Sequence, residues 1–333
     1  DAAGVSELML SLLGIIPLKK VEVQVSPEKK LIPGGMAIGV ALHTSGVLVV
    51  GTSDLSGGEA GPARVGGILP GDLIRKVRDV DLTSSAQFSQ LVADAGEEAL
   101  PLTLERNGET LHVTVTPRMD ATTGTARLGM WVRDSSAGVG TLTFVDAQAG
   151  VFAGLGHPIS DSDTGERVAL RSGEIVACQI VGCTGGTAGS PGELKGKFIS
   201  DHALGRICIN GENGVYGTVS TAIAGQQTEI AFAQEVLPGA AEILTTTSGE
   251  TPRSYRVYIE KVNAADPRRN MVLRVTDPAL LAQTGGIVQG MSGSPIVQDG
   301  RIAAVVTHVF VNEPNRGYGV YAFWMYSVAC GEN

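Results

Sequence analysis

Apolar and polar residues alternate in short runs along most of the chain. The clearest example spans residues 102–115, where two alternating runs flank the pair Asn107 and Gly108. Such a pair between alternating runs is typical of a β-hairpin. Similar short runs recur at 140–145 and 217–223, with glycine-rich turns between them. The pattern predicts a mainly β protein built from many short strands.

Helical spacing is predicted at two places. Residues 84–92 begin with Ser84, a favourable N-cap residue, and continue with apolar residues at helical spacing. Asp277 precedes a proline at the first helical position, and Gly285 ends the run. This arrangement is typical of a short helix.

Composition agrees with this pattern and narrows the function classes. The 333 residues include 45 glycines and only 5% aromatic residues, as expected for numerous tight turns. The net charge is −9 and no basic cluster extends beyond lysine pairs, which argues against nucleic-acid binding. The cysteines Cys178, Cys183, Cys208 and Cys330 lack zinc-like spacing, so no metal or cofactor is expected. A disulfide among the first three and buried thiols are both open interpretations.

The first 30 residues differ from the rest of the chain. Residues 8–17 are apolar but far shorter than the ~20 residues that span a bilayer. We expect residues 1–30 to be a segment that follows a membrane anchor, or a propeptide, or a segment that packs on the body.

Residues 31–118 form one compact unit in the sequence pattern. The run 67–74 and the hairpin at 102–115 resemble those of a PDZ domain. In that family a Gly-Φ-Gly-Φ loop presents backbone N–H groups to a peptide carboxylate, and the adjacent strand edge pairs with the peptide. The matching residues in this chain are Ala37, Ile38, Gly39 and Val40. The resemblance implies peptide binding at this loop; the alternative is a PDZ fold that packs on its own protease and binds no free C-terminus.

The sharpest motif lies at residues 290–295, Gly-Met-Ser-Gly-Ser-Pro, and resembles the Gly-Asp-Ser-Gly-Gly-Pro of chymotrypsin-like proteases. The glycines allow a tight turn to expose a hydroxyl while two backbone N–H groups hold the tetrahedral oxyanion. We therefore predict Ser292 as the nucleophile and the amides of Gly290 and Ser292 as the oxyanion donors. Ser294 is the alternative nucleophile, but a proline follows it where the pattern has glycine.

A serine nucleophile needs a base and a group that orients it. His157 follows a predicted strand and is surrounded by small residues, as the catalytic histidine is in chymotrypsin-like folds. His308, on the strand after the nucleophile, is the rival. For the acid, Asp161, Asp163 and Asp277 are all open. Asp277 precedes the predicted nucleophile by only 15 residues (292 − 277) and is also explained as a helix cap.

Four segments together carry a more specific resemblance, to the SpoIVB peptidases of endospore-forming bacteria. These segments are residues 127–141, 154–161, 213–218 and 284–295. The resemblance extends over about residues 31–327 and implies a PDZ domain at 31–118, followed by a chymotrypsin-like double β-barrel peptidase domain at 119–333. Carried over onto matching positions, the family's catalytic residues are His157, Asp277 and Ser292.

The resemblance also implies a place of action and partners. SpoIVB-like peptidases cross the forespore membrane and act in the space between forespore and mother cell. There they cleave their own N-terminal region and a membrane-bound regulatory subunit of an intramembrane metalloprotease, and a late sigma factor is then activated. We therefore expect an extracytoplasmic serine endopeptidase that is anchored in the membrane before processing. The alternatives are a catalytically silent PDZ adaptor and an HtrA-like quality-control protease, although in the latter the protease precedes the PDZ domain.

Overall fold

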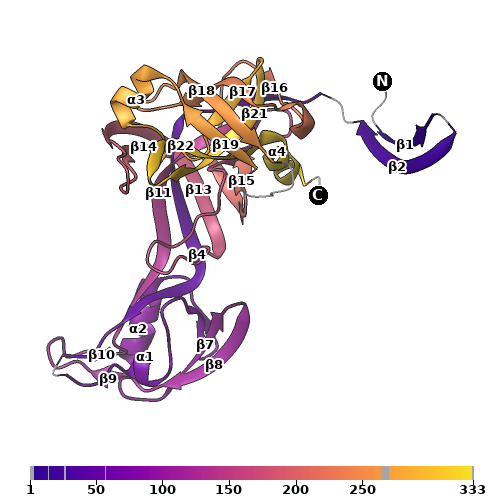
Figure 1. Cartoon of the computed structure of the whole chain (residues 1–333). Coiled ribbons are helices and arrows are strands. Elements are labelled where there is room, and N and C mark those ends of the chain that lie inside the picture. Colours follow the sequence, from indigo (N-terminus) through magenta and orange to yellow (C-terminus); the bar gives the residue numbers. More distant parts are fainter. Residues whose placement is uncertain (1–3, 14, 26–27, 57, 264–269, 332–333) are drawn as a thin grey trace.

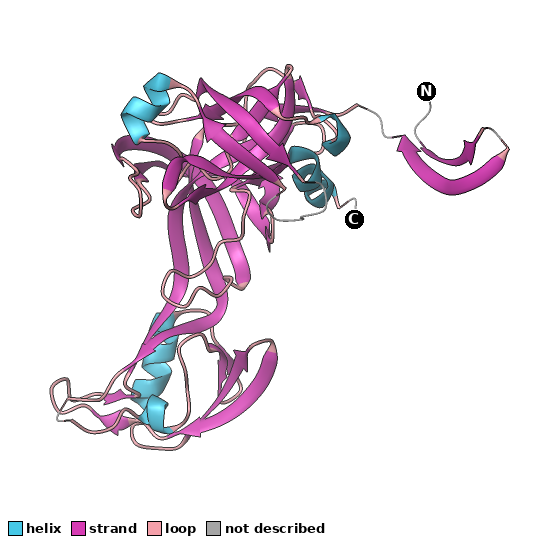
Figure 2. Cartoon of the chain, viewed as in Figure 1, coloured by secondary structure: helices cyan, strands magenta, loops and turns pink. Residues whose placement is uncertain are grey.

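Two closed β-barrels form the body of the protein (Figures 1 and 2). The computed structural model describes residues 4–13, 15–25, 28–56, 58–263 and 270–331. In the first barrel the strand order is β11-β12-β15-β14-β13-β4, and β4 pairs back with β11 to close the ring. Its strands are β4 (Ala37–Thr52), β11 (Met130–Asp146), β12 (Val151–Gly154), β13 (Leu170–Thr184), β14 (Glu193–Gly211) and β15 (Gly214–Val219).

The second barrel closes in the order β17-β18-β19-β22-β21-β20. Its strands are β17 (Gly239–Thr245), β18 (Arg253–Val262), β19 (Met271–Val275), β20 (Pro295–Gln298), β21 (Arg301–Phe310) and β22 (Glu313–Tyr321). The short elements around it are η1 (Ala233–Glu235), α3 (Pro278–Thr284) and α4 (Ala322–Cys330). The predicted mainly β fold with a double barrel is thereby confirmed.

The two barrels share an apolar core. Phe144 and Tyr216 of the first barrel cluster with Ile302 of the second and with Met325 and Tyr326 of α4, and all five are buried. Short strands β3 (Lys30–Pro33) and β16 (Thr228–Glu229) extend the first sheet beside β11. The barrels are therefore held in a fixed relation, which a cleft between them requires.

A smaller unit, residues 47–132, is inserted into the first barrel between β4 and β11; we call it the inserted unit. It has its own apolar core, drawn entirely from this range. Its elements, besides the outer ends of β4 and β11, are α1 (Pro62–Val65), β5 (Leu73–Val77), β6 (Val80–Asp81), α2 (Ser85–Ala95), β7 (Leu100–Arg106), β8 (Glu109–Val115), β9 (Arg118–Met119) and β10 (Ala126–Arg127). In Figure 1 the long strands β4 and β11 run from the barrels into this unit.

Local predictions for the inserted unit and for α3 are confirmed. The hairpin β7–β8 turns at Asn107, whose φ of 53° is left-handed. The Ser84 hydroxyl caps α2 by accepting the N–H of Gln87. Helix α3 starts at the Asp277 cap and ends at Gly285 in the left-handed conformation. In each case the sequence pattern involves only neighbouring residues, so it predicts the local structure independently of the surrounding topology.

The predicted domain boundary at residue 31 is wrong, and so is the predicted peptide loop at residues 37–40. Ala37, Ile38, Gly39 and Val40 lie in β4 within the first barrel, where β11 pairs on one side and β13 on the other. No strand edge is left there for a peptide. The lack of a side chain at Gly39 instead leaves room for the ring of Phe198 over the strand.

The three central cysteines are present as thiols rather than as a disulfide in the described part of the chain. Cys178 is buried, Cys183 is partly buried and Cys208 is exposed. Burial raises the pKa of the Cys178 and Cys183 thiols. The buried-thiol interpretation therefore holds best for Cys178.

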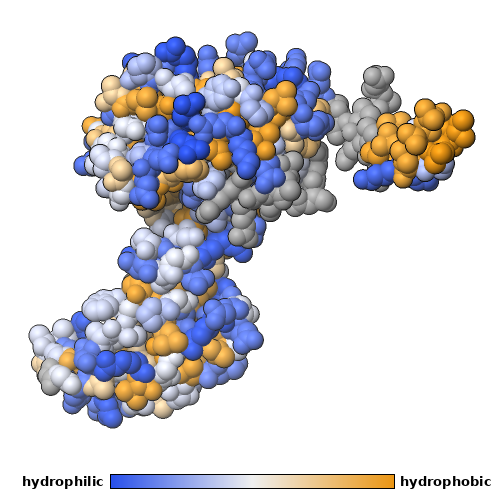
Figure 3. Space-filling model, in the orientation of Figure 1, coloured by the Kyte–Doolittle hydropathy of each residue, from blue (hydrophilic) through white to orange (hydrophobic). Residues whose placement is uncertain are grey.

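Near the N-terminus, β1 (Gly4–Leu12) and β2 (Ile16–Val25) form a separate antiparallel hairpin. Its apolar side chains are exposed, including Leu8, Leu10 and Leu18 at 54%, 52% and 64%, and they form the apolar patch at the edge of Figure 3. Among the described residues, no helix has the length and apolar character needed to span a bilayer.

Candidate active site

The serine-bearing turn follows α3 and adopts a conformation that only glycines permit. Gly290 and Gly293 have φ values of 95° and 96°. A Cβ at Gly293 would lie 2.2 Å from the Thr141 carbonyl oxygen and 2.5 Å from the amide nitrogen of Leu155. The glycine therefore allows the turn to press directly against the backbone of the first barrel.

Two buried threonines of β11 hold this turn in place. The Thr141 hydroxyl donates to the Gly290 carbonyl over 2.8 Å, and the Thr143 hydroxyl donates to the Gly293 carbonyl over 2.8 Å. The Thr141 amide also donates to the Ser292 carbonyl over 3.1 Å. The turn belongs to the second barrel and the threonines to the first, so these bonds fix Ser292 relative to both barrels.

The two candidate serines have opposite environments. Ser292 lines a cleft of about 560 Å³, and its hydroxyl donates to the Thr307 carbonyl over 2.7 Å. Ser294 is fully buried, and its hydroxyl donates to Thr245 over 3.0 Å. Only Ser292 is placed where a substrate can reach its hydroxyl.

The backbone of the turn also leaves two amides for an oxyanion. Met291 donates to the Val288 carbonyl and Gly293 to the Val306 carbonyl. Among the described residues, neither the Gly290 nor the Ser292 N–H donates to a backbone carbonyl. These are the two amides predicted as oxyanion donors, and both residues line the cleft.

His157 lies in the same cleft, just beyond β12. Leu155 and Gly156 precede it with φ values of 72° and 69°, and a Cβ at Gly156 would lie 2.9 Å from the Val306 carbonyl oxygen. This close approach brings the chain against β21, next to the carbonyl that accepts the Ser292 hydroxyl. The structure thus brings two of the predicted catalytic residues together.

The imidazole of His157 is oriented by a backbone carbonyl. Its Nδ1 lies 2.8 Å from the Pro158 carbonyl oxygen. A carbonyl only accepts, so Nδ1 carries the proton and Nε2 keeps the lone pair that a general base needs. Burial lowers the pKa of His157 below 6.5, and the bond to Pro158 offsets this only in part. The neutral form therefore persists to lower pH than for an exposed histidine.

His308, the rival base, is exposed on β21 with its ring centroid 5.0 Å from that of His157. It lines the cleft as a wall beside the predicted base. Among the described residues that line the cleft, His157 and His308 are the only titratable side chains.

Asp277 does not lie among the residues that line this cleft. Its Oδ1 accepts the N–H groups of Ala279 and Leu280, and its Oδ2 accepts the Arg256 N–H over 3.2 Å. Burial opposes its ionisation, but these donors outweigh that effect and lower the pKa of the carboxyl. The contacts described for Asp277 are those of a helix cap, and they lend no support to its predicted role as the third catalytic residue.

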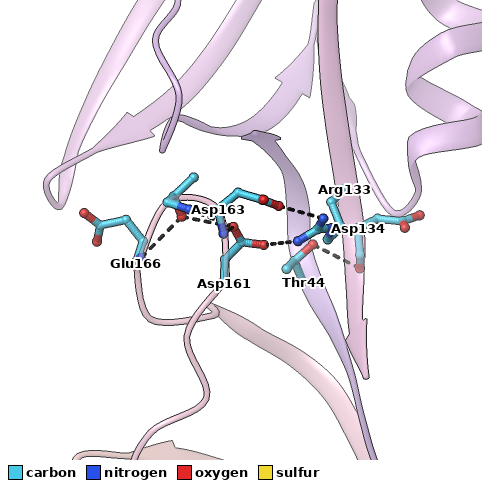
Figure 4. A network of polar contacts seen from close by, with 7 residues as sticks. Thr44, Arg133, Asp134, Asp161, Asp163 and Glu166 are labelled. Atoms are coloured by element: carbon cyan, nitrogen blue, oxygen red, sulfur yellow. Dashed lines mark hydrogen bonds and ion pairs between the residues drawn. The ribbon is translucent and has the colours of Figure 1, made fainter. Parts of the chain in front are cut away.

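The other two aspartates also point elsewhere. Asp161 and Asp163 both form ion pairs with Arg133 of β11, at 2.6 and 2.7 Å (Figure 4).

The residue that sequence reasoning missed is Asn210 of β14. Its side chain accepts the Ile159 N–H and donates to the carbonyls of Ile159 and Val168. It therefore fixes the segment that follows His157, a role no local pattern signals.

We expect Asp277→Asn to retain the reactivity of Ser292 within about threefold. Asparagine caps helices about as well as aspartate, so the melting temperature should also stay close to that of the wild type. Asp277→Ala should lose ~1 kcal/mol of stability through the lost cap. Thermal unfolding and peptide hydrolysis of both variants check this. A stable Asp277→Asn protein with activity down a hundredfold would restore the carboxylate to the catalytic machinery.

Two closed barrels with a serine and a histidine facing one cleft define the class of chymotrypsin-like peptidases. A family model described as SpoIVB peptidase S55 matches residues 124–326, and the chain belongs to this family. The chain is also 36% identical over 100 residues to a protein of Treponema pallidum (strain Nichols) named "Putative zinc metalloprotease". That match covers 28% of this chain and 21% of that protein, so the chain spans about a fifth of the relative's length.

Proposed function

We propose that the protein is an extracytoplasmic serine endopeptidase in which Ser292 is the nucleophile and His157 the general base. The observation that carries this proposal is the shared cleft, which is lined both by Ser292, on a turn held by hydrogen bonds, and by His157, whose Nε2 is left to accept a proton. Membership of the peptidase family supports it. A catalytically silent adaptor would not need a turn held by two buried threonines.

The geometry suggests the order of events. The Ser292 hydroxyl turns from the Thr307 carbonyl to Nε2 of His157, which takes its proton as the oxygen attacks the scissile carbonyl. The oxyanion that forms is held by the amides of Gly290 and Ser292. His157 then returns the proton to the leaving amine as the C–N bond breaks. A water molecule, deprotonated by His157, hydrolyses the acyl-enzyme and restores the Ser292 hydroxyl. The Pro158 carbonyl keeps the imidazole in the required tautomer, a task that an aspartate performs in other serine peptidases.

The biological role that we propose follows the family. The peptidase acts between forespore and mother cell, cleaves its own N-terminal region, and cleaves a membrane-bound regulator of an intramembrane metalloprotease so that a late sigma factor is activated. The exposed hairpin of β1 and β2 supports self-cleavage, because an extended segment that projects from the body can enter the cleft of another copy.

Self-cleavage between molecules gives a direct test. Wild-type protein mixed with a tagged Ser292→Ala copy should shorten the tagged copy near its N-terminus, and the tagged copy alone should stay intact. A mixture in which neither chain shortens, with both folded, would favour the silent adaptor.

We also propose that the inserted unit binds extended peptides as PDZ domains do, at a site different from the predicted one. A groove of about 500 Å³ runs between α2 and the start of β11, with Phe88 and Val92 on one side and Met130 and Trp131 on the other. At these positions the described β11 pairs only with β4, so the edge that faces α2 is open to a peptide strand. Trp131 is 61% exposed. The tryptophan fluorescence of the wild-type protein should therefore change when a peptide with a free carboxylate is added. The same addition should not change the fluorescence of Trp131→Phe.

A further inference from the structure

The segment that follows His157 is held between the barrels and the inserted unit. We call residues 158–169 the His157 loop. On the barrel side it is fixed by Asn210, as described above. On the other side, the Ala169 carbonyl accepts the N–H of Ser45, which lies on β4 close to where that strand enters the inserted unit. The loop therefore depends on strands that belong to both units.

The strongest contacts of this loop are made with Arg133. One guanidinium nitrogen lies 2.6 Å from Asp161 and another lies 2.7 Å from Asp163 (Figure 4). The Asp161 side chain is only 1% exposed, and its other oxygen accepts the N–H groups of Asp163 and Thr164. A charge this deeply buried is costly unless it is paired, so the loop conformation depends on Arg133. Burial opposes ionisation of Asp161, but these N–H donors and the guanidinium lower the pKa of its carboxyl.

Arg133 and its neighbour Asp134 connect this loop to the groove of the inserted unit. Arg133 directly follows the groove-lining segment Met130–Val132 on β11. The Asp134 carboxylate accepts the N–H of Ser85, the first residue of α2, over 2.8 Å. Two consecutive residues of one strand thus fix the His157 loop and the helix that forms the other wall of the groove.

We propose that Arg133 is a positioning residue for His157, and that through Asp134 it links the reactivity of Ser292 to the state of the groove between α2 and β11. This inference rests on the proposed function. Arg133 does not line the cleft; it acts by pairing with Asp161 and so keeping the half-buried His157 beside Ser292. A shift of β11 or α2 on peptide binding would move Arg133 and with it the loop.

The test uses the full chain and a fluorophosphonate reagent that labels a reactive serine, with the maximal labelling rate separated from reagent affinity. Arg133→Met should lower the maximal rate at least tenfold, with reagent affinity little changed, and Arg133→Lys should recover part of it. Asp161→Asn should behave like Arg133→Met, and the double variant should be no slower than the slower single variant. Arg78→Met, which breaks the exposed ion pair with Glu98, is the matched control and should label at the wild-type rate.

A pH profile separates positioning from loss of folded protein. Loss of folded protein lowers the labelled fraction but leaves the acid limb of the rate where it was. Loss of positioning exposes His157, so its acid limb should move up toward pH 6.5 in Arg133→Met. His308 on β21 is the titratable neighbour that faces His157 in the cleft, and its substitution in the same background shows that the limb belongs to His157.

The link to the groove is tested by Asp134→Ala against Ser84→Ala. Both loosen the start of α2, but only the first releases it from β11. Asp134→Ala should slow labelling severalfold and add nothing in the Arg133→Met background, whereas Ser84→Ala should leave the rate unchanged. Wild-type protein that is not labelled would overturn the proposed function itself. Labelled wild-type protein with an equally fast, folded Arg133→Met variant and an unmoved acid limb would overturn this inference alone.

Discussion

Ser292→Ala is expected to abolish peptide hydrolysis, with a loss of ~10⁴ to 10⁶-fold in turnover. No other hydroxyl at this turn can replace the lost nucleophile, because Ser294 is buried and bonded to Thr245. The fold should survive, since Ser292 contributes a single side-chain hydrogen bond, to the Thr307 carbonyl, worth ~1 kcal/mol. Hydrolysis of an unfolded protein substrate and thermal unfolding of the same sample measure the two effects.

Ser294→Ala is the matched control, and the opposite result is expected from it. It leaves the Thr245 hydroxyl without its donor in a fully buried site, so stability should fall by ~1 kcal/mol or more while turnover is kept. Retained hydrolysis in Ser292→Ala together with its loss in a folded Ser294→Ala protein would show that the wrong serine has been assigned.

His157→Ala is expected to be as damaging as the serine change, because the two residues act as a unit and their effects do not add. The double variant should therefore be no slower than Ser292→Ala alone. In the wild type, burial lowers the pKa of His157, and the base is active only when neutral. Activity should then persist below pH 6.5 and fall on further acidification, as the imidazolium forms. The pH dependence of kcat/KM in the free enzyme measures this.

His308→Ala serves as the control for the base. His308 is exposed and its ring is 5.0 Å from that of His157, so we expect at most a tenfold decrease and an acid limb that stays below pH 6.5. An inactive His308→Ala enzyme beside an active His157→Ala enzyme would reverse the assignment. An acid limb well above pH 6.5 would contradict the buried, neutral imidazole.

The elements that sequence predicts well are those set by local chemistry. The Asn107–Gly108 hairpin, the Ser84 cap of α2 and the Asp277 to Gly285 boundaries of α3 all form as expected. The serine turn can also be predicted from the sequence, because Gly290 and Gly293 adopt positive φ values that favour glycine. The prediction of His157 as the base also depends on its likeness to the histidine that follows a strand in the first barrel of related peptidases.

The domain organisation could not be predicted in the same way. Strands β4 and β11 each serve two units, and an alternating run gives no sign of where a strand leaves one core and enters another. A short glycine-containing run such as residues 37–40 fits both an anion-binding loop and a packed barrel strand, and the structure has the strand. The segment that lines the groove lies about 90 residues further along, at Met130–Val132.

Residues that act through tertiary contacts leave no local signal. Asn210 and Arg133 fix the His157 loop from β14 and β11, and neither belongs to a motif. Asp277 shows the converse: its place in a family pattern suggested catalysis, while its contacts are those of a helix cap. Along the chain, helix α3 lies between Asp277 and Ser292.

Covalent labelling of the full chain with a fluorophosphonate, followed by peptide mapping, tests most directly whether Ser292 is a nucleophile activated by His157. We expect one modified residue, Ser292, in the wild type and in Ser294→Ala, with labelling lost in Ser292→Ala and slowed at least a thousandfold in His157→Ala. Folded wild-type protein that stays unlabelled, or that is labelled at a serine outside the cleft, would contradict the account.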